Sequence, residues 1–295
     1  MAARGHAGGA TLGLPASEAT RAPVPVTIIE PARGWVPLKL GEFWAYRELL
    51  YFLVWANVKV QYKQTVLGAA WAIIQPLFTM VVFSIFFGRL AGIPSGDLPY
   101  PVFAYAALVP WTYFANAVSL SSNVLVHHQG VITKVYFPRA IMPLASVVGG
   151  LLDFSIALSV LAVLMAVYGV VPSLAVLALP LFVLLAVLTA TGMGLWLSAL
   201  NVRYRDVRFI IPFLIQVWLF ATPVAYPSDL IPERWRALYG LNPMTGVIEG
   251  FRWALLDQPA PSIAMMAASA LIMLAVLGSG MAYFTRAEKT FADVV

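Results

Sequence analysis

Cysteine is absent from this chain of 295 residues, and histidine occurs only three times, at His6, His127 and His128. The lack of cysteine excludes disulfides, thiolate metal sites and cysteine nucleophiles. Two of the histidines are neighbours, and neighbours on a helix point about 100° apart, so they are badly placed to share a metal ion. We therefore expect no metal site and no cofactor bound by this chain.

A nucleotide-binding loop is also missing. No Gly-Lys-Ser or Gly-Lys-Thr sequence occurs, and Gly192-Met-Gly194 is not followed by the third glycine of a dinucleotide-binding turn. The sequence therefore predicts that the chain neither binds nor hydrolyses ATP by itself.

Charged residues are scarce, at 11% of the chain, whereas soluble domains average roughly 25%. Because 61% of the residues are hydrophobic, there is too little polar surface to cover a soluble particle. The composition predicts an integral membrane protein. The net charge of +5 is typical of membrane proteins with Lys and Arg in their cytoplasmic loops, so we expect no nucleic-acid partner.

Residues 1–41 contain no long apolar run. A cleavable signal peptide needs an apolar core of about 7–15 residues, which this region lacks. We expect a flexible cytoplasmic tail here, in which residues 24–29 are a candidate short strand.

Residues 42–64 combine aromatic and apolar side chains with the cations Arg47, Lys59 and Lys63. Trp and Tyr favour the headgroup zone of a bilayer, so the pattern predicts an amphipathic helix lying in the membrane interface. Residues 57–63 alternate with period two, as in a strand, but no turn or partner strand adjoins them. A helix is favoured.

Six apolar runs follow, each near the roughly 20 residues that span a bilayer. They predict an all-α membrane domain over residues 67–284. No repeat relates its halves, so an inverted-repeat transporter gains no support. The runs cover 67–91, 102–126, 141–168, 174–199, 208–226 and 262–284.

The distribution of positive charge predicts the orientation. With the N-terminus inside, the inner segments and the tail 285–295 hold 14 of the 18 Lys and Arg residues. This bias places both termini in the cytoplasm of a multi-pass protein. The four cations outside these segments are Arg89, Arg234, Arg236 and Arg252.

The outer segment 227–261 is interrupted by Pro227, Pro232, Pro243 and Pro259 and contains two short amphipathic pieces, 233–239 and 244–256. Two short helices folding back toward the membrane fit this pattern, because irregular backbone at membrane depth must be buried in protein or line a wet cavity. A plain loop is the alternative. We expect a re-entrant helical hairpin.

The inner loop 127–140 is short and basic, with a compact helical piece that ends at Pro138. We expect Tyr136 and Phe137 to be exposed there, as a docking surface for a cytoplasmic partner. Contact with anionic lipid headgroups is the alternative.

Asp153 is the clear ionisable residue inside a predicted span. Such a residue is a candidate for a proton or substrate contact, but a hydrogen bond between packed helices is favoured, since no intramembrane cation pairs with it. Gly149, one turn earlier, permits close approach of another helix. A second small-residue face, expected to serve helix packing, comprises Ala186, Ala190, Gly194 and Ser198.

The spans are rich in aromatic residues with sparse polar groups between them. Such surfaces suit a sugar chain, whose rings have apolar C–H faces and hydroxyl edges. Interfacial aromatic belts and lipid-facing side chains are the alternative. The candidate substrate path comprises Trp71, Gln75, Phe78, Phe83, Trp111, Tyr113, Phe213, Trp218 and Tyr226.

Several motifs in order resemble the permease subunits of ABC-2 type exporters of bacterial polysaccharides, the O-antigen, capsule and teichoic-acid group, and are most similar to the O-antigen exporters. The resemblance covers about residues 42–285. The motifs are YKQTVLGAAWAIIQP at 62–76, TKVYFPR at 133–139, NVRYRDVR at 201–208, YGLNPM at 239–244 and GFRW at 250–253.

The resemblance implies a homodimer in the bacterial inner membrane that pairs with two ABC ATP-binding subunits, where ATP and Mg would bind. The cargo would be a lipid-linked polysaccharide with a pyrophosphate head, entering beside the interfacial helix, and the outer hairpin would close the external gate. Residues 127–140 would couple to the ATPase through Lys134, Tyr136, Phe137 and Arg139.

The chain departs from the family pattern in the interfacial helix. Family members often have Arg-Asp where this chain has Ala56-Asn57, and Arg where it has Gln61. The resemblance then leaves Arg47, Lys59 and Lys63 as the residues for the pyrophosphate, with anchoring to anionic lipid as the alternative.

Two other functions remain open from the sequence. One is an ABC-2 exporter of another substrate, such as a lipid, a drug or teichoic acid. The other is a membrane-embedded glycan-transferring enzyme, which would need a carboxylate or histidine cluster at one membrane face, and Asp153 alone does not provide one.

Overall fold

The computed structural model describes residues 44–63, 70–132, 137–204, 206–232, 235, 238–289 and 291. These residues form helices joined by turns and contain no strand longer than an isolated bridge. The expected all-α fold is confirmed for this part of the chain. The predictions for residues 1–41 lie outside it.

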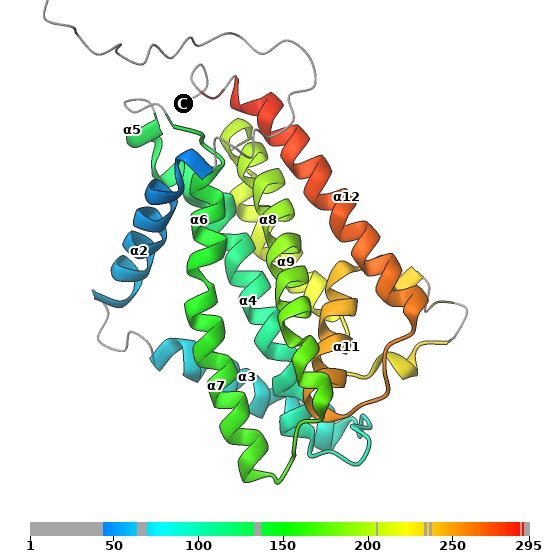
Figure 1. Ribbon diagram of the computed structural model, residues 1–295. Helices are drawn as coiled ribbons and strands as arrows, with labels where there is room; N and C mark the ends of the chain where they lie inside the picture. The colour runs from blue at the N-terminus through cyan, green and yellow to red at the C-terminus, as the bar shows by residue number, and fades with distance from the viewer. Residues whose placement is uncertain are drawn as a thin grey trace, which may run out of the picture. The chain divides into compact units, whose positions relative to one another are not determined.

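Helix α2 (Arg47–Lys63) is the first described element and lies beside α6 (Ile141–Gly149) (Figure 1). Tyr46, Leu49 and Leu53 pack on the protein, while Tyr51 and Phe52 are largely exposed. This spacing of about one helical turn gives α2 a protein face and an aromatic outer face, as an interfacial helix requires. The helical interpretation of residues 57–63 is confirmed.

Helix α4 (Tyr100–His127) is the centre of the bundle, and most of its residues are buried. Helix α3 (Ala70–Phe83) packs against it and continues into a π-helical segment, η1 (Ser84–Leu90). A single helical turn, α5 (Gln129–Ile132), follows α4.

Helices α6 and α7 (Leu151–Val167) follow one another with Gly150 between them and occupy the third predicted span. A 3-10 turn, η2 (Leu174–Ala178), leads into α8 (Leu179–Arg203), and α12 (Ile263–Glu288) closes the fold. Four segments are long and apolar enough to cross a membrane: Ala70–Leu90, Ile141–Val167, Leu174–Arg203 and Ile263–Glu288.

The small-residue face of α8 packs as predicted. Ala186, Ala190 and Ser198 are buried, and a Cβ added to Gly194 would lie 2.3 Å from Ser121 Oγ on α4. On the side of α8 toward α12, a Cβ on Gly192 would lie 2.8 Å from the backbone of Leu277. Small residues on two sides of α8 therefore let α4 and α12 approach it closely.

Helix α9 (Val207–Phe220) is shorter than the expected fifth span, 208–226. At about 1.5 Å per residue its 14 residues reach roughly 21 Å. The helix gives way to turns before Pro223, because proline disfavours helical backbone in the residue that precedes it. The count of six spans stays a prediction.

The outer segment contains η3 (Ser228–Leu230) and α11 (Pro243–Leu256). Asn242 caps α11 by accepting the Met244 N–H, and twelve of the fourteen residues of α11 are buried against α4, α8 and α12. A plain exposed loop does not describe this segment. Most of the first predicted piece, 233–239, lies outside the described residues.

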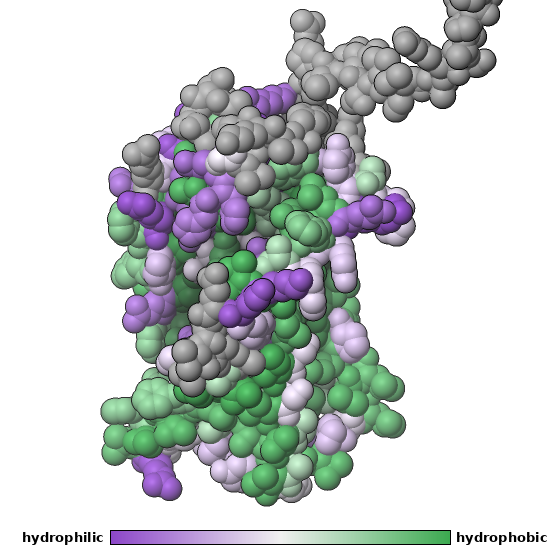
Figure 2. Space-filling model, turned by 90° about the vertical axis from the view of Figure 1, so that its left-hand side faces the viewer, coloured by the Kyte–Doolittle hydropathy of each residue, from purple (hydrophilic) through white to green (hydrophobic). Residues whose placement is uncertain are grey.

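Hydrophobic and hydrophilic side chains separate along the bundle. On the face that carries α2, hydrophobic side chains cover the lower part and hydrophilic ones gather toward the upper part (Figure 2). The upper end is also where α5 and the last turns of α12 lie (Figure 1). A broad apolar surface with one polar end suits a protein embedded in a bilayer.

Candidate functional site

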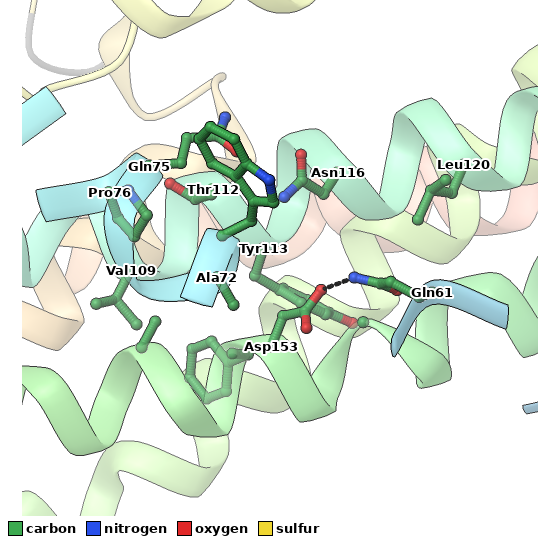
Figure 3. A pocket seen from close by; sticks show the side chains of 14 residues that line it. Gln61, Ala72, Gln75, Pro76, Val109, Thr112, Tyr113, Asn116, Leu120 and Asp153 are labelled. Carbon is green, nitrogen blue, oxygen red and sulfur yellow. Dashed lines mark hydrogen bonds between the residues drawn. The ribbon is translucent and has the colours of Figure 1, made fainter. Parts of the chain in front are cut away.

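A cavity of about 100 Å³ lies where the end of α2 meets α3, α4 and α7 (Figure 3). We call it the interfacial cavity. Four separate helices supply its walls, so its geometry depends on how they pack. It is lined by Gln61, Trp71, Ala72, Gln75, Pro76, Val109, Thr112, Tyr113, Asn116, Leu120, Gly150, Asp153, Phe154 and Ala157.

The interfacial cavity has an apolar floor. Val109, Tyr113 and Phe154 are each less than a tenth exposed. The rings of Tyr113 and Phe154 meet edge to face at 5.6 Å, and the Tyr113 hydroxyl donates to the Val147 carbonyl at 3.2 Å. These contacts hold the floor in one arrangement.

The rim of the cavity is polar and more exposed. Gln61, Gln75 and Asn116 are exposed amides, and the Trp71 indole beside them is 55% exposed. An apolar floor under a few hydrogen-bonding groups is the usual composition of a small-molecule site.

Asp153 ties the end of α2 to α7. Gln61 Nε2 donates to one carboxylate oxygen at 2.7 Å (Figure 3), and the Tyr62 hydroxyl donates to the other. Burial and the neighbouring carboxylate raise the pKa of the Tyr62 hydroxyl above its ordinary value, so it remains a donor at neutral pH. The interpretation of Asp153 as a packing contact is confirmed.

The close approach expected at Gly149 is made by α2. A Cβ added to Gly149 would lie 3.9 Å from the Cβ of Asn57. The sequence could indicate this approach but not its partner, because 92 positions separate the two residues.

The predicted substrate path is divided among several places. Trp71, Gln75 and Tyr113 come together in the interfacial cavity. Phe83 and Trp111 are buried in the hydrophobic core, whereas Phe78 and Phe213 are 68% and 64% exposed on the outer surfaces of α3 and α9. The role of the whole set stays a prediction.

Trp218 and Tyr226 belong to a polar network at the outer segment. The Trp218 indole donates to Asn242 Oδ1 at 2.9 Å, and the Asn242 amide donates to Thr222 Oγ1 at 2.8 Å. The Tyr226 and Tyr239 hydroxyls form a hydrogen bond. These side chains fasten the turn after α9 to the start of α11.

The predicted pyrophosphate residues do not all lie together. Lys59 and Lys63 are four residues apart on α2 and therefore share one face. Arg47 is twelve residues from Lys59, about 18 Å along the helix, too far to share one pyrophosphate with it. The Lys59 ammonium lies 5.6 Å from the Trp55 ring, and the Arg47 guanidinium lies 5.5 Å from the Trp44 ring.

Phe137 in the predicted coupling loop is buried, so the expectation that it is exposed is wrong. It packs with Leu125, Phe284 and Phe291 in a cluster to which the end of α12 contributes. A hydrophobic ring next to a helix from a distant part of the chain gains more from that contact than from exposure.

Arg139 is fixed to the end of α12. Its backbone N–H donates to the Glu288 carboxylate at 2.9 Å, its guanidinium donates to the Glu288 carbonyl at 3.0 Å, and it lies 5.8 Å from the Phe291 ring. Lys134 and Tyr136 lie outside the described residues. The coupling role of all four residues stays a prediction.

Arg252 on α11 is the main feature that sequence analysis did not single out. It is 1% exposed, donates to the Val224 and Tyr226 carbonyls at 2.9 and 3.2 Å, and stacks 3.7 Å over the Phe103 ring. The available signal was this cation within the amphipathic piece 244–256 of the outer segment.

Glu249 forms an ion pair with Arg252 at 3.3 Å. Burial lowers the pKa of Arg252 to about 10, with Glu249 opposing the shift. Burial also raises the pKa of Glu249, although the Arg252 charge opposes this. The cause of both shifts is burial, with 2% of the Arg252 side chain and 15% of the Glu249 side chain exposed.

Comparison with known proteins adds a family and several relatives. The ABC-2 type transporter family matches residues 48–256. The chain is 30% identical over 258 residues to the O-antigen export system permease protein RfbA of Myxococcus xanthus, covering 86% of this chain and 98% of that protein. It is 29% identical to RfbA of Klebsiella pneumoniae, with 84% and 95% covered. It is 23% identical to the polysialic acid transport protein KpsM of Escherichia coli, with 79% and 91% covered.

Proposed function

The chain belongs to the ABC-2 type transporter family, and from this premise we propose that it is the permease subunit of an ATP-driven exporter of a lipid-linked, O-antigen-like polysaccharide. The observation that carries the proposal is the similarity to O-antigen export permeases over nearly their whole length. The interfacial cavity supports it, because aromatic and amide groups together match the faces and edges of sugar rings.

The exporter works as a homodimer with two separate ATP-binding subunits, which carry the ATP and Mg. Residues 127–140 dock on the ATPase and transmit its closure. The end of α12 contacts Arg139 and Phe137, and these contacts give the docking segment a rigid support. Tyr136 rather than buried Phe137 is therefore the aromatic residue to test for coupling.

The chain crosses the bacterial inner membrane six times with both termini in the cytoplasm. Helix α4 makes the second crossing, and α9 with the turns after it makes the fifth. The outer segment 227–261 is a re-entrant hairpin that closes the external gate. The burial of α11 and its network around Arg252 support this assignment, since such a segment needs partners for its polar groups.

The cargo enters at the cytoplasmic end, beside α2. Its pyrophosphate meets Lys59 and Lys63, which lie one turn apart, while the first sugars reach the interfacial cavity. The glycan then moves between the two copies along the aromatic surfaces of α3 and α9, where Phe78 and Phe213 are exposed.

Deletion of the gene from its own host tests this proposal. We expect loss of the surface polysaccharide, accumulation of the lipid-linked glycan on the cytoplasmic side, and recovery of both by the wild-type gene. The measurement is extraction of glycolipid from the inner membrane, together with labelling of surface glycan. An unchanged surface polysaccharide without accumulation would contradict the proposal.

A further inference from the structure

We propose that the interfacial cavity binds one uncharged sugar unit of the cargo, and that Asp153 makes this subsite reject anionic sugars. The inference rests on the proposed export function and narrows it to a class of glycan. It follows from three properties of the cavity: its shape, its hydrogen-bonding groups and its charge.

The shape suits part of a single ring. The cavity measures about 100 Å³, which is roughly three times the volume that one water occupies in the liquid. A pyranose ring enters edgewise with its apolar C–H face on an aromatic wall, leaving its outer edge at the open rim. Trp71, half exposed on α3, offers the indole face for this contact, and Phe154 closes the floor.

The hydrogen-bonding groups match hydroxyls. Gln75 and Asn116 carry amides that both donate and accept, and Thr112 adds a hydroxyl, whereas the Gln61 amide nitrogen already donates to Asp153. Sugar hydroxyls also donate and accept, so either orientation of a ring finds partners. The Tyr113 hydroxyl is already used on the Val147 carbonyl, and this residue contributes its ring.

The charge decides between neutral and anionic sugars. Asp153 is the one charged side chain among the described residues that line the cavity. Its carboxylate accepts hydrogen bonds but cannot donate them. It can therefore accept a hydrogen bond from a sugar hydroxyl, but it repels the negative charge of a sugar carboxylate. In a partly buried site this repulsion is screened less than at an open surface.

The neighbouring cations lie outside the lining of the cavity. Lys59 and Lys63 are on α2 but are not among the residues that line the cavity, and the Lys59 ammonium lies against the Trp55 ring. The arrangement thus separates a cationic place for the pyrophosphate on α2 from a neutral-sugar subsite beneath its end.

Binding of defined tetrasaccharides to the full-length chain in nanodiscs tests the subsite. The neutral probes are a mannose and a glucose tetrasaccharide, and the anionic probe is tetrasialic acid, each followed by saturation-transfer NMR titration. We expect wild-type protein to bind at least one neutral probe about tenfold more tightly than the anionic one. Trp71→Ala weakens neutral binding about tenfold, whereas Phe86→Ala, which removes a similarly exposed ring in η1 outside the cavity, leaves it unchanged.

Two variants address the charge. Asp153→Asn removes it and is expected to bring the affinities for neutral and anionic probes within about twofold of each other. Because Asp153 also anchors α2, Asn116→Lys provides a second route: it adds a cation at the exposed rim, leaves Asp153 in place, and raises affinity for tetrasialic acid.

Three results would each overturn the subsite: equal wild-type affinity for neutral and anionic probes, absence of binding to both neutral probes, or an equal loss of binding in Trp71→Ala and Phe86→Ala. A different result would contradict the export function, namely unchanged surface polysaccharide after gene deletion. If deletion abolishes surface polysaccharide and wild-type protein binds all probes equally, the exporter stands and the neutral-sugar subsite falls.

Discussion

Asp153 on α7 and Arg252 on α11 both lie among apolar helices, yet their surroundings differ. Asp153 is partly exposed beside a cavity and is held by two side chains of α2. Arg252 is fully buried, with its guanidinium on two backbone carbonyls, on Glu249 and on the Phe103 ring. The carboxylate keeps room for a ligand, whereas the guanidinium is occupied by the fold.

The difference teaches how a charge in a membrane protein can be assigned a role. The Arg252 side chain is 1% exposed, and its guanidinium contacts two carbonyls, a carboxylate and the Phe103 ring, although its buried Nε has no hydrogen-bond partner. Such a group organises the turn 221–226, and the cargo cannot reach it. An ionisable residue becomes a candidate for binding only where the structure leaves space next to it.

Replacement of Arg252 is expected to have the largest effect. Arg252→Met leaves the Val224 and Tyr226 carbonyls without their donor and the largely buried Glu249 without its cation. Breaking a buried pair in this way costs about 3–5 kcal/mol. Thermal unfolding in nanodiscs measures it, and Arg89→Met, at an exposed cation, is the matched control. Equal melting temperatures for the two variants would mean that Arg252 does not organise the outer segment.

Replacement of Asp153 is expected to cost less. Asp153→Leu removes both hydrogen bonds to α2, but Gln61 is exposed and Tyr62 only partly buried, so water replaces the lost partner. We expect a loss of about 2 kcal/mol, and faster hydrogen exchange in α2 while α4 and α8 keep their protection. A global increase in exchange would instead place Asp153 in the same structural class as Arg252.

The stacking of Phe103 under Arg252 should contribute a smaller amount. Phe103→Leu keeps an apolar side chain but removes the ring face, and the expected loss of stability is about 1–2 kcal/mol. The measurement is a double-mutant cycle with Arg252→Met. Strict additivity of the two changes would show that the 3.7 Å contact carries no interaction energy of its own.

Gln61→Ala should have the smallest effect, about 1 kcal/mol or less, because the side chain is exposed and its hydrogen bond competes with water. Its expected signature is local, namely faster exchange at the C-terminal end of α2. Tyr62→Phe, at the partly buried second donor to Asp153, serves as the comparison and should cost more. The reverse order would mean that the amide, not the tyrosine, holds α2 on α7.

The sequence predicts the helices of this protein more accurately than the contacts between them. Runs of apolar residues located α8 and α12, and the pattern of residues 244–256 located α11 to within one residue of its start. The aromatic and cationic pattern of residues 42–64 predicted the helix α2. These features depend on local periodicity and length, which the sequence shows directly.

The prediction of an exposed Phe137 failed for a physical reason. A short loop gives no sign of what covers it, and the residues that bury Phe137 include Phe284 and Phe291, about 150 positions later. The shortened α9 is likewise followed by turns held from the outer segment, where Asn242 donates to the Ala221 carbonyl before Pro223 and Arg252 donates to the Val224 carbonyl after it.

By itself, the sequence determined that this protein is an all-α membrane protein of the ABC-2 type, because composition, apolar length and ordered motifs are properties of the chain. Only the tertiary structure decided what its isolated charges do. Asp153 became an anchor beside a cavity, and Arg252 became the centre of a closed network. In each case the fold brought in a partner from a distant part of the chain, up to 149 positions away for Arg252. Burial and hydrogen bonding between distant helices set these roles, and no local pattern encodes them.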